Sequence, residues 1–584
     1  MRRFPQYLLM GFILVVFGAF LIWPIVQVVR VGFTGINGGG FTFGYLISIF
    51  QDHALRKGLL NSALIAVSVT ILCTCIAVPL AMMSVRLDFF GKSLVSGLLL
   101  VPLILPPFVG AIGMRQILGR FGMLTSVAQD AGVVPPGTPI DWIGAARVLG
   151  IVLIESLGLY PIMFLNVSAA LANLDPAMQQ AAANLGASPW RVFWRITFPL
   201  MRPGLFAGGT IVLIWSFTEL GTPLMFDFYQ VTPVQIFHRI QQISGSPVPY
   251  ALVVVMLLGS VILYVIGKLI LGRRTDASVS KASIQSAPRK LSPAASIPVL
   301  IPFLIVSGLA LLPHIGVLLM SVSGVGTWYQ SALPRVFTMQ HYVTGLTHPL
   351  TLPSVQNSVF FASFSTVIDI ALGLAIAWLL VRTTLPGRQI LDSLAMLPLA
   401  VPGLVLAFGY LAISIRLQAW FNDIFNITAH PDRRWLRDMV DVTQNPTLLL
   451  VIAYAMRRLP YVVRSAVAGL EQTPADLELA ARNLGASPIT TLRRITVPLI
   501  SANLIAGGLL AFAFAMLEVS DSLLLAQRES HWPITQAIYQ LNGRLGDGPY
   551  IASALGVWAM LILTLTILSA NSLLGRRMGA VFRV

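Results

Sequence analysis

Long apolar stretches separated by short polar segments dominate the hydropathy pattern of the chain. A helix needs about 20 mostly apolar residues to cross the hydrocarbon core of a bilayer. Stretches of this kind predict twelve membrane-spanning helices, near residues 8–30, 59–85, 93–118, 144–165, 203–226, 250–271, 297–321, 355–381, 389–415, 446–463, 499–526 and 550–574. The pattern therefore predicts an all-α integral membrane protein.

Composition supports lipid as the main solvent. Charged residues make up 10% of the 584 residues and apolar residues 56%, whereas about a quarter of a soluble domain is charged. The net charge of +16 does not predict nucleic-acid binding, because no run of Lys and Arg alternates with aromatic residues. Basic residues of membrane proteins gather in cytoplasmic loops instead.

The distribution of Lys and Arg sets the expected orientation. An even number of spans puts both termini on one side, and more of the 38 basic residues face the cytoplasm if the termini lie there. The apolar run after Arg2 and Arg3 is too long for a signal peptide, and no cleavage site of small residues follows it. We therefore expect a retained first helix and two cytoplasmic termini.

The chain contains an internal repeat. Asn61-Ser62 recurs as Asn357-Ser358 at an offset of 296, and the segment NLGASPWRVFWRITFPL at 184–200 recurs as NLGASPITTLRRITVPL at 483–499. Each copy holds six predicted spans, so the halves are parallel repeats that can enclose a path between them. We divide the chain into a first half (1–271), a Ser/Ala/Pro-rich cytoplasmic linker (272–296) and a second half (297–584).

The loops after the fourth and tenth predicted spans, about 171–200 and 470–499, share one pattern. Each predicts a short Ala-rich helix, a glycine that ends it, and a Ser-Pro pair that caps and starts a second helix. A proline then opens the next membrane helix. The residues concerned are Gln180, Ala181, Ala182, Gly186, Ser188 and Pro189 in the first copy, and Leu479, Ala480, Ala481, Gly485, Ser487 and Pro488 in the second.

At these residues the chain resembles the permease subunits of binding-protein-dependent ABC importers. Their signature is Glu-Ala-Ala, three residues, Gly, and later Ile-x-x-Pro, which this chain matches at 196–199 and 495–498. The resemblance implies the type I importer permease fold, with these segments as coupling loops that dock on an ATPase. The chain departs from the signature because Gln180 and Leu479 replace the glutamate, although Glu478 lies one place earlier.

The resemblance also implies partners and a location. We expect two copies of a cytoplasmic ABC ATPase, a periplasmic or extracellular solute-binding protein, and the bacterial inner membrane. ATP and Mg would be bound by the ATPase, because the only approach to a phosphate loop, Gly91-Lys92-Ser93, has Arg86 in place of its first glycine. We therefore expect no cofactor on this chain, no catalytic residues and transport by alternating access.

Ionisable residues inside spans are candidates for the translocation path. Glu155, Glu219, Asp369, Glu518 and Asp521 qualify, and Glu219 and Glu518 occupy equivalent positions of the repeat. We select Glu219, Glu518 and Asp521. The alternative, given equal weight, is a structural carboxylate held by neighbouring hydroxyls such as those of Thr218 or Ser520. The histidines and the two cysteines lack metal-ligand spacing, so no metal site is expected.

The substrate is the least constrained part of the prediction. The segments LPLAVPGLVLAFGY and LEVSDSLLLAQ resemble the fused ferric-iron permeases, and VPLILPPFVGAIGMRQILGRFG resembles the 2-aminoethylphosphonate permeases. We rank ferric iron ahead of organophosphonate, with thiamine and polyamines further away. A proton-coupled secondary transporter with two six-helix halves is the rival class, but that class lacks paired coupling loops.

Overall fold

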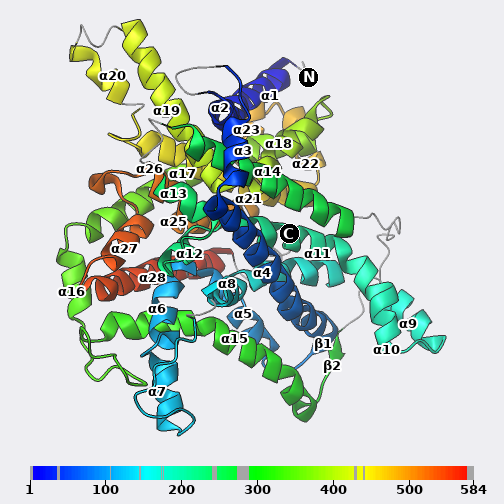
Figure 1. The fold of residues 1–584 in the computed structure, drawn as a ribbon. Helices are drawn as coiled ribbons and strands as arrows, with labels where there is room; N and C mark the ends of the chain where they lie inside the picture. The colour runs from blue at the N-terminus through cyan, green and yellow to red at the C-terminus, as the bar shows by residue number, and fades with distance from the viewer. Residues whose placement is uncertain are drawn as a thin grey trace. The chain divides into compact units, whose positions relative to one another are not determined.

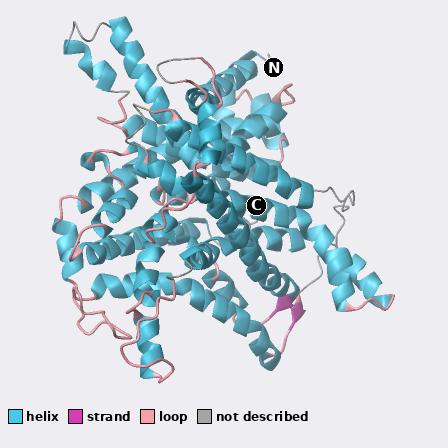
Figure 2. Ribbon diagram, viewed as in Figure 1, coloured by secondary structure: helices cyan, strands magenta, loops and turns pink. Residues whose placement is uncertain are grey.

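The computed structural model describes residues 4–35, 40–104, 107–143, 147–172, 174, 176–239, 246–271, 288–425, 431–438 and 441–574. These residues are mostly helical, and their one sheet pairs the two-residue strands β1 (Leu87–Asp88) and β2 (Arg289–Lys290) in parallel (Figure 2). They form two compact units, each assembled from separate segments. The first unit takes its residues from Met1–Arg56, Thr232–Leu257 and Gln340–Val581, and the second from Lys57–Val231 and Leu258–Met339.

Within the described residues, nine helical stretches are long and apolar enough to cross a bilayer. They are Phe4–Gly32, His53–Arg86, Arg147–Ala172, Pro189–Met225, Val248–Ile270, Pro293–Val322, Thr351–Arg382, Gly403–Phe425 and Gly548–Thr566. Two bent helix pairs raise the number to at most eleven. The prediction of an all-α membrane protein is confirmed, while its count of twelve spans is not.

Two predicted spans are interrupted. The span predicted near 389–415 is present but displaced, because α18 (Arg388–Ala400) ends and α19 (Gly403–Phe425) begins beyond Pro402, and only α19 is long enough to cross. The stretch 93–118 is divided among α5 (Lys92–Leu98), a 3-10 turn (Val101–Ile104) and α6 (Pro107–Leu118). Prolines cause such breaks because they cannot donate a helical hydrogen bond.

The span predicted at 446–463 is a helix of a different character. It forms part of α21 (Thr447–Gln472), which carries three arginines and is not apolar enough to qualify as a span. α21 packs against α17 (Thr351–Arg382) and α25 (Ser501–Met516). Ala377, Ala466, Leu470, Ile500 and Leu504 form a buried cluster in this three-helix core. Protein therefore surrounds much of α21, which explains how it accommodates charge.

The first helical stretch of the chain packs on a helix from the predicted second half. This stretch comprises α1 (Phe4–Phe17), a π turn (Gly18–Ile22) and α2 (Trp23–Gly32), and it lies against α19. The Tyr410 hydroxyl donates to the carbonyl of Phe20 at 2.6 Å, and Arg416 donates to Gln27 at 3.0 Å. Figure 1 shows α2 beside α19 within this unit.

The converse packing occurs in the second unit. There α15 (Pro293–Val322), the first helix of the predicted second half, lies against α6. Gly113 and Gly316 face one another so closely that a Cβ on Gly113 would come within 2.5 Å of a backbone atom. Each half therefore contributes its first helix to a unit built mainly from the other half.

The predicted linker falls largely outside the described residues, which omit 272–287. The remainder, 288–296, holds β2 and the start of α15 at Pro293, where the Ser292 hydroxyl accepts a hydrogen bond from the amide of Ala295. The helix thus begins inside the range assigned to the linker. The division of the chain at 271 and 297 stays a prediction.

Candidate functional site

The first predicted coupling loop has the expected local structure. α9 (Pro176–Asn184) ends before Gly186, whose φ of +81° lies in the left-handed region that glycine adopts without strain. Ser188 then caps α10 (Pro189–Val192), and its hydroxyl accepts from the amide of Arg191 at 3.4 Å. The predicted order of helix, glycine, cap and second helix is confirmed here.

The second loop repeats this geometry. α22 (Asp476–Asn483) ends before Gly485, which has a φ of +85°. Ser487 caps α23 (Pro488–Thr491), and its hydroxyl accepts from the amide of Thr490 at 3.2 Å. Two loops 299 residues apart in the sequence therefore reach one backbone geometry through the same residue types.

The proline expected to open the next membrane helix does not do so in the first copy. There helical backbone continues from α10 through a π turn (Phe193–Thr197) into α11 (Phe198–Phe217). In the second copy a π turn (Leu492–Thr496) leads into α24 (Val497–Leu499), and the axis bends by 76° before α25. The break thus lies at Ile500 and not at the proline.

Both loops expose large apolar side chains at matched positions. Leu185 and Leu484, each directly before the positive-φ glycine, are 88% and 90% exposed. Trp190 and Ile489, each directly after the Ser-Pro pair, are exposed as well. Large apolar side chains seldom cluster on a water-exposed protein surface unless a partner protein or a membrane covers them. The candidate residues Gln180, Ala181, Leu479 and Ala480 are also exposed, whereas Ala481 is buried.

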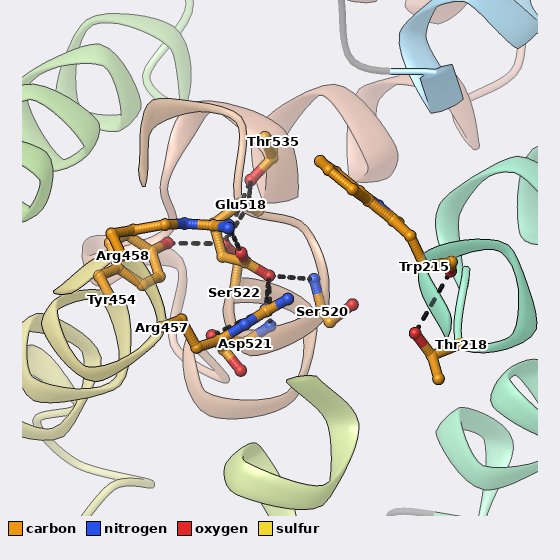
Figure 3. A network of polar contacts seen from close by, with 10 residues as sticks. All are labelled: Trp215, Thr218, Tyr454, Arg457, Arg458, Glu518, Ser520, Asp521, Ser522 and Thr535. Atoms are coloured by element: carbon orange, nitrogen blue, oxygen red, sulfur yellow. Dashed lines mark hydrogen bonds and ion pairs between the residues drawn. The ribbon is translucent and has the colours of Figure 1, made fainter. Parts of the chain in front are cut away.

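The candidate carboxylates of the second half belong to a buried ionic cluster (Figure 3). Glu518 follows α25, and Asp521 lies in α26 (Ser520–Leu525). Nη1 of Arg457 lies 2.5 Å from Glu518 and 3.2 Å from Asp521, and Arg458 pairs with the other oxygen of Glu518. The two arginines and two carboxylates balance in charge.

Hydrogen bonds hold this ionic cluster in place. Oε1 of Glu518 accepts from the amides of Ser520 at 3.1 Å and Asp521 at 3.4 Å. The hydroxyls of Ser522 and Thr535 donate to the backbone carbonyl of Glu518 at 2.6 and 2.7 Å, and Tyr454 contacts Ser522 at 2.8 Å. Buried charges persist only when they are paired and hydrogen-bonded in this manner.

Sequence reasoning selected the two carboxylates of this cluster but missed its arginines. One sequence feature could have identified the arginines. Arg457 and Arg458 lie inside the stretch 446–463, which was predicted to span the membrane. Ionisable side chains of either sign are expensive there and need a partner. Considering only the acidic residues of the spans therefore left the carboxylates without their basic partners.

Glu219 in the second unit has part of the same geometry. Its Oε1 accepts from the amides of Gly221 at 3.1 Å and Thr222 at 3.3 Å, which correspond to Ser520 and Asp521 in the repeat. The positions that correspond to Arg457 and Arg458 are Gly158 and Leu159. The repeat therefore preserves the carboxylate and its backbone amides, while the arginines belong to the second half alone.

The hydroxyls of Thr218 and Ser520, which were expected to bind the two carboxylates, do not supply these contacts. The Thr218 hydroxyl donates to the carbonyls of Ile214 at 2.9 Å and Trp215 at 3.3 Å. Ser520 reaches Glu518 through its backbone amide and not through its hydroxyl. Backbone amides thus supply the interaction that the structural alternative assigned to side chains.

Two further acidic residues are buried outside the ion pairs of this cluster, although Asp369 lies near enough to Arg458 to interact with its charge. Glu155 accepts a hydrogen bond from the Ser216 hydroxyl, and Asp369 is fully buried with no hydrogen-bond partner in the described part of the chain. Among the described residues no group of three or more His, Cys, Asp or Glu side chains is placed to hold a metal ion.

Comparison with known proteins agrees with the repeat. The model of the family described as binding-protein-dependent transport system inner membrane component matches twice, at residues 74–276 and 369–579. A ferric transport system permease protein of Actinobacillus pleuropneumoniae is 26% identical over 97% of this chain and 78% of its own length. A putative ferric transport system permease protein of Haemophilus influenzae is 26% identical over 88% of this chain and 76% of its own length. A molybdenum transport system permease protein of the same organism is 34% identical, but over only 26% of this chain and 62% of its own length.

Proposed function

Because the chain belongs to the family of inner membrane components of binding-protein-dependent transport systems, we propose that it forms both halves of a ferric-iron import path driven by separate ATPase subunits. It is a multi-pass membrane permease of an ABC importer. The iron substrate rests on the ferric transport permeases, which align with 97% and 88% of the chain. The molybdenum permease aligns with only 26% of the chain, so it supports molybdenum as the substrate much less than the other two support iron.

Two copies of a cytoplasmic ATPase dock on the coupling loops 171–200 and 470–499. The support is the matched exposure of Leu185 and Leu484 beside two glycines of positive φ. Burying a leucine side chain contributes roughly 1.5–3 kcal/mol. The glutamate of the family signature is absent from both loops, so shape and apolar contact carry the docking. ATP and Mg are bound by the ATPase.

Transport proceeds by alternating access. ATP binding closes the ATPase pair and draws the two loops together, and the membrane helices that follow the loops carry the motion into the bilayer. Helical backbone that continues from α10 into α11 supports this transmission, because it leaves no flexible joint between loop and membrane helix. A solute-binding protein delivers the substrate from outside, and both termini lie in the cytoplasm.

The carboxylates at the end of the fifth helix of each half border the path. Glu219 and Glu518 share their position in the repeat and their paired backbone amides. In the second half Arg457 and Arg458 neutralise Glu518 and Asp521, so the ionic cluster presents no net negative charge to the path. Glu219 is the stronger candidate for direct influence on a cation.

Reconstitution tests the proposed function. The chain, its ATPase and its binding protein are placed in proteoliposomes, and uptake of radioactive ferric iron is measured with and without ATP. We expect uptake that requires ATP, the ATPase and the binding protein together. Uptake driven by a proton gradient without the ATPase would support the secondary-transporter class. ATPase stimulation by another loaded binding protein, but not by the ferric one, would refute iron.

A further inference from the structure

Glu478 in the second coupling loop points into the protein, toward the end of a membrane helix. Its carboxylate lies 3.1 Å from Nε of Arg382, the last residue of α17. The side chains of Arg382 and Glu478 are 11% and 6% exposed. The acidic residue nearest to the signature position is thus engaged within the chain, and it is not available to a docking partner.

The same guanidinium reaches a third helix. Nη2 of Arg382 donates to the carbonyl of Thr473 at 2.8 Å, directly after α21. Ala481, one turn beyond Glu478 on α22, is buried on the same face of that helix. Arg382 therefore ties together the ends of α17, α21 and α22. A charge-assisted contact that is largely shielded from water holds its geometry better than an exposed one.

Among the described residues of the first loop, which omit 173 and 175, no such tie is present. Arg86 corresponds to Arg382 at the offset of 296, and Gln179 corresponds to Glu478 at the offset of 299. Arg86 donates instead to the hydroxyl of Thr197 at 3.2 Å, beyond the coupling helices. Gln179 is neutral and half-buried. The repeat thus keeps the arginine in both copies but supplies an acidic partner on the coupling helix in only one.

We propose that Arg382 and Glu478 form a strut that makes the second coupling helix, α22, move together with α17. The two coupling loops then transmit ATPase motion by different routes. The first uses the helical backbone that continues from α10 into α11, and the second, whose axis bends by 76° before α25, uses the contact of Arg382 with Glu478. Both are positioning residues, since they act on the path through α17. The proposal rests on the proposed function, because it requires an ATPase that moves α22.

Charge-neutralising variants and a charge-exchanged double variant test the strut in the complete transporter. Glu478→Gln and Arg382→Gln are compared with the double variant Arg382→Glu/Glu478→Arg. The control is Gln179→Ala at the matched position of the first loop. The readouts are copurification of the ATPase, ATP hydrolysis and iron transported per ATP. We expect each single variant to keep the ATPase bound but to lower iron transported per ATP by about tenfold, with the double variant recovering to within about threefold.

Hydrogen exchange supplies a readout that does not depend on transport. Amides of 476–483 should exchange faster in Glu478→Gln than in the unaltered chain, while those of α9 stay unchanged. Full coupling and unchanged exchange in Glu478→Gln would overturn the strut. Loss of ATPase binding in that variant would also overturn it, since Glu478 would then serve docking. If iron is not the substrate, hydrogen exchange and ATP hydrolysis still test the strut. Failure of the strut can therefore be distinguished from failure of the proposed function.

A crosslink covers the case in which the single variants fold poorly. Cysteines replace Arg382 and Glu478 in a chain whose Cys73 and Cys75 are serine, and a short bifunctional thiol reagent joins them. Retained transport after crosslinking is expected, because a strut does not change length during the cycle. Arrest of transport by the crosslink would show that α22 must separate from α17, which contradicts the proposal.

Discussion

Arg457 and Glu518 are joined by an ion pair of 2.5 Å that links α21 to the segment between α25 and α26. The same guanidinium nitrogen also reaches Asp521. Asp521 is fully buried and Glu518 nearly so, so water cannot replace a partner that is removed. This cluster therefore joins two helical elements as well as neutralising charge.

Arg457→Gln should unfold the second half at lower temperature. The substitution leaves Glu518 with one arginine and Asp521 without its ionic contact, and removing one member of a buried pair costs about 3–5 kcal/mol. Thermal unfolding in detergent measures the change. Arg464→Gln is the control, because Arg464 pairs with Asp392 at 3.3 Å and both side chains are partly exposed. An exposed pair contributes about 0–1 kcal/mol. Equal shifts for the two variants would refute a stabilising role for the cluster.

Leu484→Asp should weaken ATPase binding without unfolding the chain. The side chain is exposed in the isolated permease, so a charge there costs little until an apolar partner covers it. Leu185→Asp should behave in the same way. Copurification of the ATPase measures the effect. Leu545→Asp is the matched control, because Leu545 is 99% exposed in a different loop. Loss of the ATPase from the control as well would show that the effect is not specific to the coupling loops.

Gly485→Val should disturb the second coupling loop more than Gly485→Asn. The glycine has a φ of +85°, where a side chain costs roughly 1–2 kcal/mol and a β-branched one more. No atom lies within 4 Å of an added Cβ, so strain at that atom comes from the backbone conformation and not from a clash. Transport-coupled ATP hydrolysis should fall in the order glycine, asparagine, valine. Equal activity for all three residues would mean that the loop does not keep this conformation in the working complex.

Acid should loosen a contact between His348 and the loop before α28 (Gly548–Leu574). Nη1 of Arg544 lies 2.6 Å from Nε2 of His348, and burial together with the Arg544 charge lowers the pKa of His348 from its usual 6.5. Between the lowered pKa and 6.5 the unfolded chain binds more protons, so stability rises with pH across this window and falls on acidification. Thermal unfolding at several pH values measures the slope. His348→Gln should flatten it, and an unchanged slope would assign the pH dependence to another group.

Local sequence signals were sufficient to predict the backbone geometry of the two proposed coupling loops. Gly186, Gly485 and the two Ser-Pro pairs each act through contacts within four residues, so their geometry follows from residue type. The pairing of Arg382 with Glu478 was not predictable, because it joins residues 96 apart that share no periodic pattern. Arg457 and Glu518, 61 residues apart, present the same difficulty.

Hydropathy predicted where apolar helices occur but not where they break. The run 389–415 is mostly apolar, yet one helix ends before Pro402 and a second begins directly after it. Conversely, α21 was counted as a span by its apolar residues, although its arginines depend on neighbouring helices. Average hydrophobicity predicts neither result. The break between α18 and α19 follows from the missing amide hydrogen of Pro402, and the placement of the arginines of α21 follows from tertiary packing.

The pairing of the first helical stretch with α19 sets an order of events during biosynthesis. Phe20 emerges from the ribosome 390 residues before Tyr410, to which it is hydrogen-bonded in the finished protein. At about 5–20 residues per second, that gap corresponds to roughly 20–80 s. During this interval the first helical stretch must wait in the lipid with its packing face uncovered. Insertion factors or proteases that recognise unassembled helices therefore have time to act on this segment before the chain is complete.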